Sequence, residues 1–141
     1  HTRGCDQKHP DLHAQNEGSA QREGRSRGLW KHRYQSTSQA RVGCVGTCDS
    51  DSDMKIFSVF PHMHLLGRRM IVETGSDEEN LTEVFRRDPY DFDAQSLSDV
   101  DLTIKQGDTV KVTCGYDNQL DQTVTFGESS TNEMCFFIGF A

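Results

Sequence analysis

The chain has 141 residues, with 22 acidic and 15 basic side chains and a formal net charge of −7 at pH 7. This length suffices for one domain with a buried core but is short for two. The sequence contains no run of eighteen apolar residues, so we expect no membrane-spanning helix.

The first 43 residues differ in composition from the rest of the chain. They carry eight Lys or Arg against four Asp or Glu, a balance of +4, while the remainder carries seven against eighteen, a balance of −11. Their few large apolar residues follow no regular period, so this stretch cannot bury enough surface to offset the entropy of the chain. We therefore predict that residues 1–43 form an irregular or disordered extension. Its basic residues are not clustered with aromatic ones, which argues against nucleic-acid binding.

From Cys44 onward the sequence is typical of a β protein. Seven short runs rich in β-branched, aromatic or alternating apolar residues are separated by turn-forming residues such as those at 75–77 and 106–108. No segment has a helical stripe of apolar residues. The pattern predicts that residues 44–141 form an antiparallel β-sandwich, with strands at 55–64, 69–74, 81–87, 100–104, 109–116, 122–126 and 134–140.

Two histidines, His62 and His64, stand at the end of the first predicted strand. Side chains two positions apart on a strand project from the same face, so both imidazoles can bind one metal ion. Met134, on the last predicted strand, would add a thioether, a soft ligand that favours Cu(I). These three residues predict a copper site with one position left open for dioxygen. Taken alone, a His-x-His pair is more often a packed part of a strand than a metal site.

Four segments that contain or surround these residues occur in the order and approximate spacing of one enzyme family: 60–68 (FPHMHLLGR), 89–95 (PYDFDAQ), 106–110 (QGDTV) and 127–135 (GESSTNEMC). In them, residues 44–141 resemble the C-terminal domain of the copper type II, ascorbate-dependent monooxygenases. The resemblance is greatest to the dopamine β-hydroxylase and monooxygenase-X branch. It implies an all-β, jelly-roll-like sandwich, truncated here at its C-terminus.

The resemblance also implies an activity. Copper held by His62, His64 and Met134 would bind and reduce dioxygen to hydroxylate an activated C–H bond of a small substrate, with ascorbate as the external reductant. Family members carry a second copper on a preceding His-rich domain, but no matching motif occurs here. We expect His1, His9, His13 and His32 to be residues of the extension. The chain alone should therefore bind copper in one site and turn over poorly.

Three positions bear on the substrate. Peptide-amidating members of the family have an arginine two residues before the first ligand histidine and polar residues just after the methionine. This sequence has Phe60, Phe136 and Ile138 there. The resemblance thus implies an apolar pocket for an aromatic or otherwise apolar substrate.

The five cysteines suggest an oxidising compartment, either outside the cell or in the secretory-pathway lumen. The resemblance supports a Cys114–Cys135 disulfide, which would close a loop of about twenty residues and contribute roughly 3 kcal/mol; two buried free thiols are the alternative. Cys44 and Cys48 resemble a pair whose family partners lie beyond the last strand, so here they either pair with each other or lack partners. Cys5 matches nothing in the family and could pair between molecules.

Asn80 begins an Asn-Leu-Thr sequon after an acidic turn, so we expect it on the surface as a possible glycosylation site.

Two other classes of function remain open from the sequence. The chain could be a secreted copper-binding module without catalytic activity of its own, which the absence of a second copper motif would fit. It could also be a structural sandwich in which His62 and His64 are incidental, and a copper titration would separate this class from the others.

Overall fold

The computed structural model describes residues 5–6, 35–36 and 40–141. The expectations for most of residues 1–43, including His9, His13 and His32, lie outside these residues, as does the side chain of Cys5. Among the described residues all regular structure is β-strand. The strands are β1 (Cys5–Asp6), β2 (Gln35–Ser36), β3 (Ala40–Ser50), β4 (Met54–Met63), β5 (Gly67–Gly75), β6 (Leu81–Arg87), β7 (Ser98–Ile104), β8 (Thr109–Asn118), β9 (Val124–Thr125) and β10 (Cys135–Phe140).

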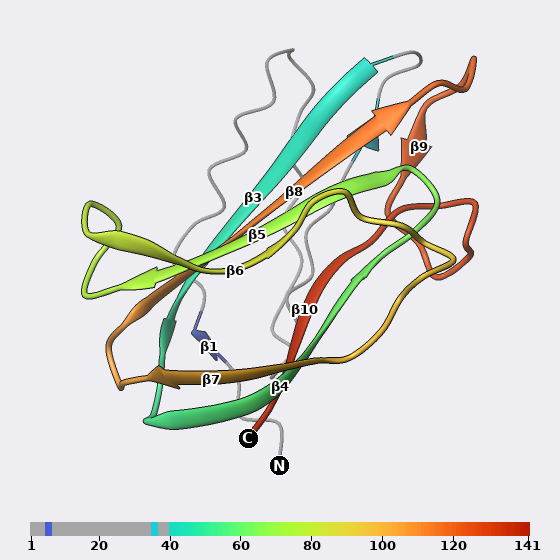
Figure 1. The fold of residues 1–141 in the computed structure, drawn as a ribbon. Coiled ribbons are helices and arrows are strands. Elements are labelled where there is room, and N and C mark those ends of the chain that lie inside the picture. Colours follow the sequence, from blue (N-terminus) through green and yellow to red (C-terminus); the bar gives the residue numbers. More distant parts are fainter. Residues whose placement is uncertain (1–4, 7–34, 37–39) are drawn as a thin grey trace.

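The strands form three antiparallel sheets. One sheet has the order β1-β3-β8-β5-β6, a second the order β10-β4-β7, and a small third sheet pairs β2 with β9. In Figure 1, β3, β8 and β5 run side by side in one layer, and β10, β4 and β7 lie in the other. This arrangement confirms the predicted antiparallel β-sandwich, while the jelly-roll connectivity stays a prediction.

The core lies between these two sheets. Val59 and Met63 of β4 and Phe137 of β10 pack in one cluster with residues of the larger sheet such as Met70 of β5 and Val112 of β8. Four of these five side chains are fully buried. From Val59 to Met63 of β4, side chains alternate between the core and the opposite face, which places His62 on the face opposite Met63.

Three of the described strands were not predicted from the sequence, the two-residue strands β1 and β2 and the long strand β3. In β3, side chains alternate strictly in burial, with Cys44, Gly46 and Cys48 inward. These inward residues are small, so the strand lacks the large apolar residues that mark a period of two. β3 also begins at Ala40, upstream of the expected boundary at residue 44.

The tight turn between β7 and β8 depends on glycine. Gly107 adopts a φ of 87°, a left-handed conformation that costs glycine little but strains residues with a Cβ. The turn predicted at 106–108 lies here.

The cysteines of the core are not equivalent. Cys114 and Cys135 form a disulfide with Cα atoms 6.1 Å apart, as expected. Cys48 is also disulfide-bonded, whereas Cys44 is a buried free thiol. The local Cys44–Cys48 pairing considered from the sequence is therefore wrong, and the alternative that these residues lack partners is wrong for Cys48. The two residues lie four apart on one strand, about 13 Å from each other, beyond the reach of a disulfide.

Asn80 lies exposed in the turn between β5 and β6, where its side-chain amide donates hydrogen bonds to the Asp77 carboxylate at 2.7 and 2.9 Å. Glycosylation of Asn80 stays a prediction. None of the described residues belongs to a helix that is long and apolar enough to cross a membrane.

Candidate metal centre

Two imidazoles meet at the end of β4. The ring centroids of His62 and His64 are 5.1 Å apart, with an angle of 82° between the ring planes. Two imidazoles that bind one ion through nitrogens at about 2.0 Å have centroids on the order of 5 Å apart. The backbone thus brings together the two histidines that the sequence singled out, in an arrangement that can hold one ion.

A hydrogen bond to Gln95 orients the His62 ring. His62 Nδ1 lies 2.7 Å from Gln95 Oε1, and Gln95 Nε2 donates to the Phe92 carbonyl at 2.9 Å. Because the Gln95 amide nitrogen is engaged, its oxygen faces His62 and accepts a hydrogen bond from Nδ1–H. The lone pair of His62 Nε2 is therefore available to a metal.

His64 is oriented in the same way by the backbone. Its Nδ1 lies 3.1 Å from the Asn132 carbonyl oxygen, which can only accept, so Nδ1 carries the proton and Nε2 the lone pair. Burial lowers the pKa of His64, and the nearby His62 acts in the same direction. Both causes favour the neutral imidazole, which is the form that binds metals.

Met134 lies one residue before β10 and His64 one residue after β4. Because Cys135 pairs with Met63 in the register of these antiparallel strands, continuing that register places Met134 opposite His64. The Met134 side chain is buried. Tyr116 of β8 donates a hydrogen bond from its hydroxyl to the Met134 carbonyl at 2.9 Å, which fixes the backbone of this residue.

The carboxylate of Glu133 joins the segments that carry His64 and Met134. Its Oε2 accepts hydrogen bonds from the backbone N–H groups of His64, at 3.1 Å, and Met134, at 3.3 Å. Its Oε1 accepts from the Leu66 N–H at 2.6 Å. Glu133 is fully buried, and this burial raises its pKa to about 7 although the hydrogen bonds act in the opposite direction.

Tyr90 fixes the residue between the two histidines. Its hydroxyl donates to the Met63 carbonyl at 2.8 Å and accepts from the Met63 N–H at 2.9 Å. Sequence reasoning gave no role to Tyr90, Gln95 or Glu133, although all three lie in the segments that carry the family resemblance. Their positions in those segments were the one feature of the sequence that could have indicated a role at this site.

The three predicted pocket residues lie on the same face of β4 and β10 as His62. In the register of β4 and β10, Phe136 lies opposite His62 and Ile138 opposite Phe60. The rings of Phe60 and Phe136 stack on His62 at centroid distances of 6.0 and 6.3 Å. His62 therefore has an apolar, aromatic surround on its own face of the sheet.

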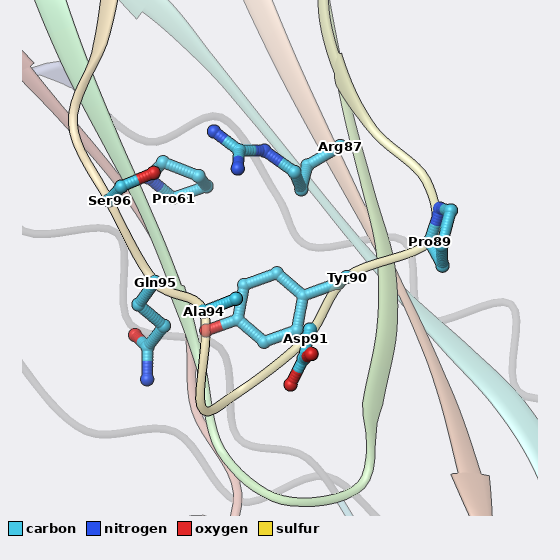
Figure 2. Close-up of a pocket in the computed structure, with 8 residues that line it drawn as sticks. All are labelled: Pro61, Arg87, Pro89, Tyr90, Asp91, Ala94, Gln95 and Ser96. Atoms are coloured by element: carbon cyan, nitrogen blue, oxygen red, sulfur yellow. The ribbon is translucent and has the colours of Figure 1, made fainter.

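A pocket lies beside β4 and the loop between β6 and β7. Figure 2 shows the side chains of Arg87 and Tyr90 extending across it toward the segment that carries Gln95. Gln95 belongs both to the pocket wall and to the hydrogen bond with His62. Phe60, Phe136 and Ile138 do not line this pocket, whose walls are Pro61, Arg87, Pro89, Tyr90, Asp91, Ala94, Gln95 and Ser96.

Comparison with known proteins gives consistent matches. The family model for the copper type II ascorbate-dependent monooxygenase C-terminal domain matches residues 32–140. The human and mouse proteins named DBH-like monooxygenase protein 2 are 33% and 34% identical to the chain over 91 and 92 residues, which cover 62% and 63% of it. Tyramine beta-hydroxylase of Caenorhabditis briggsae is 32% identical over 98 residues, or 65% of the chain. The matched regions make up only 18%, 15% and 17% of these relatives.

We predict that Glu133→Gln lowers the free energy of unfolding of the metal-free chain by about 2 to 3 kcal/mol. The amide retains one acceptor oxygen but turns an NH2 group toward backbone N–H donors. Urea unfolding measures the change, and Glu128→Gln, at an exposed position, is the matched control. Equal stability of the two variants would contradict the role of the Glu133 carboxylate.

Proposed function

The chain belongs to the copper type II ascorbate-dependent monooxygenase family, whose C-terminal domain it matches, and on this premise we propose that it is the catalytic-copper domain of a monooxygenase. His62, His64 and Met134 are the proposed ligands. The main support for this proposal is the orientation of the two imidazoles. Each donates its Nδ1 proton to a fixed acceptor, Gln95 or the Asn132 carbonyl, and thus keeps Nε2 for an ion.

The donor set fits copper. Two neutral imidazole nitrogens suit several transition metals, but a thioether is a soft donor that favours Cu(I) over zinc or magnesium. The bonds from Glu133 and Tyr116 hold the Met134 backbone on both sides of its Cα, so little of the chain has to be reordered when the metal binds. Copper would supply the activation of dioxygen on which the family's hydroxylation depends.

The remaining residues would bind and orient the substrate. Phe60, Phe136 and Ile138 present an apolar face beside His62, which favours an aromatic or apolar substrate and keeps water from the reacting C–H bond. A carboxylate substrate would find no basic side chain among these three residues. We therefore propose a small aromatic or apolar substrate, with ascorbate as reductant.

A second domain is part of the proposal. The chain spans less than a fifth of the length of the relatives that it matches, which leaves room in such proteins for an upstream His-rich domain with a second copper. Hydroxylation consumes two electrons, whereas one copper site can store one. We propose that the full protein contains this domain and resides outside the cell or in the secretory-pathway lumen, where the Cys114–Cys135 disulfide would persist.

Replacing the thioether should lower the affinity for Cu(I) much more than the affinity for zinc. Met134→Ile is expected to weaken Cu(I) binding by about tenfold or more and to change zinc binding by less than about threefold, because only the soft ion gains much from sulfur. Competition titrations with a chromogenic chelator measure both affinities. Met54→Ile, at a half-buried position away from the site, is the control. An equal loss of affinity for Cu(I) and zinc would exclude Met134 as a ligand.

Removing the hydrogen-bond acceptor of His62 should weaken copper binding without unfolding the chain. Gln95→Leu frees the ring to rotate or change tautomer, and we expect copper affinity to fall by about 10- to 100-fold. Gln122→Leu, at an exposed position, is the control. If Gln95→Leu binds copper as tightly as the parent chain, the hydrogen bond from Gln95 does not orient His62 for metal binding.

Activity should depend on the second electron source. The copper-loaded chain, given ascorbate, oxygen and a phenethylamine-like substrate, is expected to give little coupled hydroxylation, measured as product formed per oxygen consumed. Adding the upstream domain, taken from a longer transcript of the same gene, should restore coupling. His62→Ala should then abolish it while the far-UV circular dichroism stays unchanged. Efficient coupling by the 141-residue chain alone would contradict the proposed division of roles.

A further inference from the structure

Three cysteine sulfurs from three strands lie together in the core. The Sγ atoms of Cys44 on β3, Cys114 on β8 and Cys135 on β10 are all within 4.8 Å of one another. Each of these residues is at most 2% exposed. Since Cys114 and Cys135 are bonded and Cys44 is free, the fold places a thiol directly beside a disulfide.

The strand register offers Cys44 a second partner. Cys44 lies directly opposite Cys114 in the antiparallel pairing of β3 and β8. Opposed residues of such a pair have Cα atoms about 4.5 to 5.5 Å apart, within the range that a disulfide spans. A Cys44–Cys114 bridge would therefore need side-chain rotation but no movement of the strands. The disulfide of Cys48 lies four residues along β3, about 13 Å away, and is out of reach.

We propose that Cys44 is an internal nucleophile that can move the disulfide from Cys114–Cys135 to Cys44–Cys114. The Cys44 thiolate forms a bond to Sγ of Cys114, and the bond between Cys114 and Cys135 breaks. Cys135 leaves as a thiolate and takes up the proton that Cys44 released. The numbers of disulfides and thiols are the same before and after, so the step needs no external oxidant or reductant.

The core restrains this exchange. Burial raises the pKa of the Cys44 thiol to about 11, and the charge of Glu133 acts in the same direction. Within the described part of the chain, the titratable groups that act on Cys44 are Glu133 and Tyr116, whose hydroxyl oxygen is 3.7 Å from the Cys44 sulfur. Because the thiolate is the attacking species, exchange is slow near pH 7 and accelerates as the pH rises.

The exchange would release the start of β10. The native bond ties Cys135 to β8, and Met134 immediately precedes Cys135. After exchange, β10 keeps its hydrogen bonds to β4 but loses its covalent link to β8. This consequence rests on the proposed function: if Met134 binds copper, the exchanged isomer holds Cu(I) less tightly than the native one.

Peptide mapping tests the exchange without reference to copper. The oxidised chain is incubated at pH 7 and pH 9 without reductant and quenched with acid. It is then unfolded and alkylated at low pH, and its disulfide-linked peptides are identified by mass spectrometry. We expect the alkyl label to move from Cys44 to Cys135 as a Cys44–Cys114 peptide appears, about 100-fold faster at pH 9, because the thiolate fraction rises tenfold per pH unit.

The controls distinguish the possible failures. The rate should not depend on protein concentration, and in Cys44→Ser and Cys44→Ala the label should never reach Cys135. A label that stays on Cys44 at pH 9 would overturn the proposal, as would a Cys44–Cys135 product or a concentration-dependent rate. A Cu(I) titration of both isomers then tests the link to Met134. Equal affinities would overturn that link alone, and a native isomer that binds no Cu(I) would count against the proposed function and not against the exchange.

Discussion

One buried carboxylate joins the backbone segments of the candidate metal centre. Glu133 accepts backbone hydrogen bonds from His64, Leu66 and Met134, residues that lie on the turn after β4 and at the approach to β10. Without it, three N–H groups would be left in a desolvated region, each at a cost of about 1 to 3 kcal/mol. The carboxylate thus holds the segment that carries His64 close to the segment that carries Met134.

The centre is assembled where three connections meet. The turn between β4 and β5, the loop between β6 and β7 and the segment before β10 lie at one end of the sandwich (Figure 1). The middle loop adds Tyr90 and Gln95, whose hydrogen bonds reach Met63 and His62. β4 carries His62, and His64 and Met134 lie directly beside the ends of β4 and β10. The loop residues fix the ring orientation of His62 and the backbone of Met63.

The sequence predicted those features that depend on a short period. Strands with large apolar residues inward, such as β5 and β8, were recognisable, whereas β3 was not because Cys44 and Gly46 do not mark an inward face. The shared placement of His62 and His64 follows from their separation of two residues. The bonds of Tyr90 and Glu133 join residues 27 and 69 positions apart, and no local pattern encodes such pairs. The position of Cys44 opposite Cys114 likewise joins residues far apart in the sequence.

The pairing of β10 with β4 limits where the length of this chain can vary. A single residue gained or lost between Glu133 and Phe137 would exchange the two faces of β10. Phe136 would turn from His62 into the core, Phe137 would leave it, and Cys135 would no longer meet Cys114. The exposed turn at 76–80 and the exposed residues 119–123 carry no such constraint. Insertions and deletions among homologues should therefore accumulate in these two surface segments, and an alignment that opens a gap at 133–137 is misplaced.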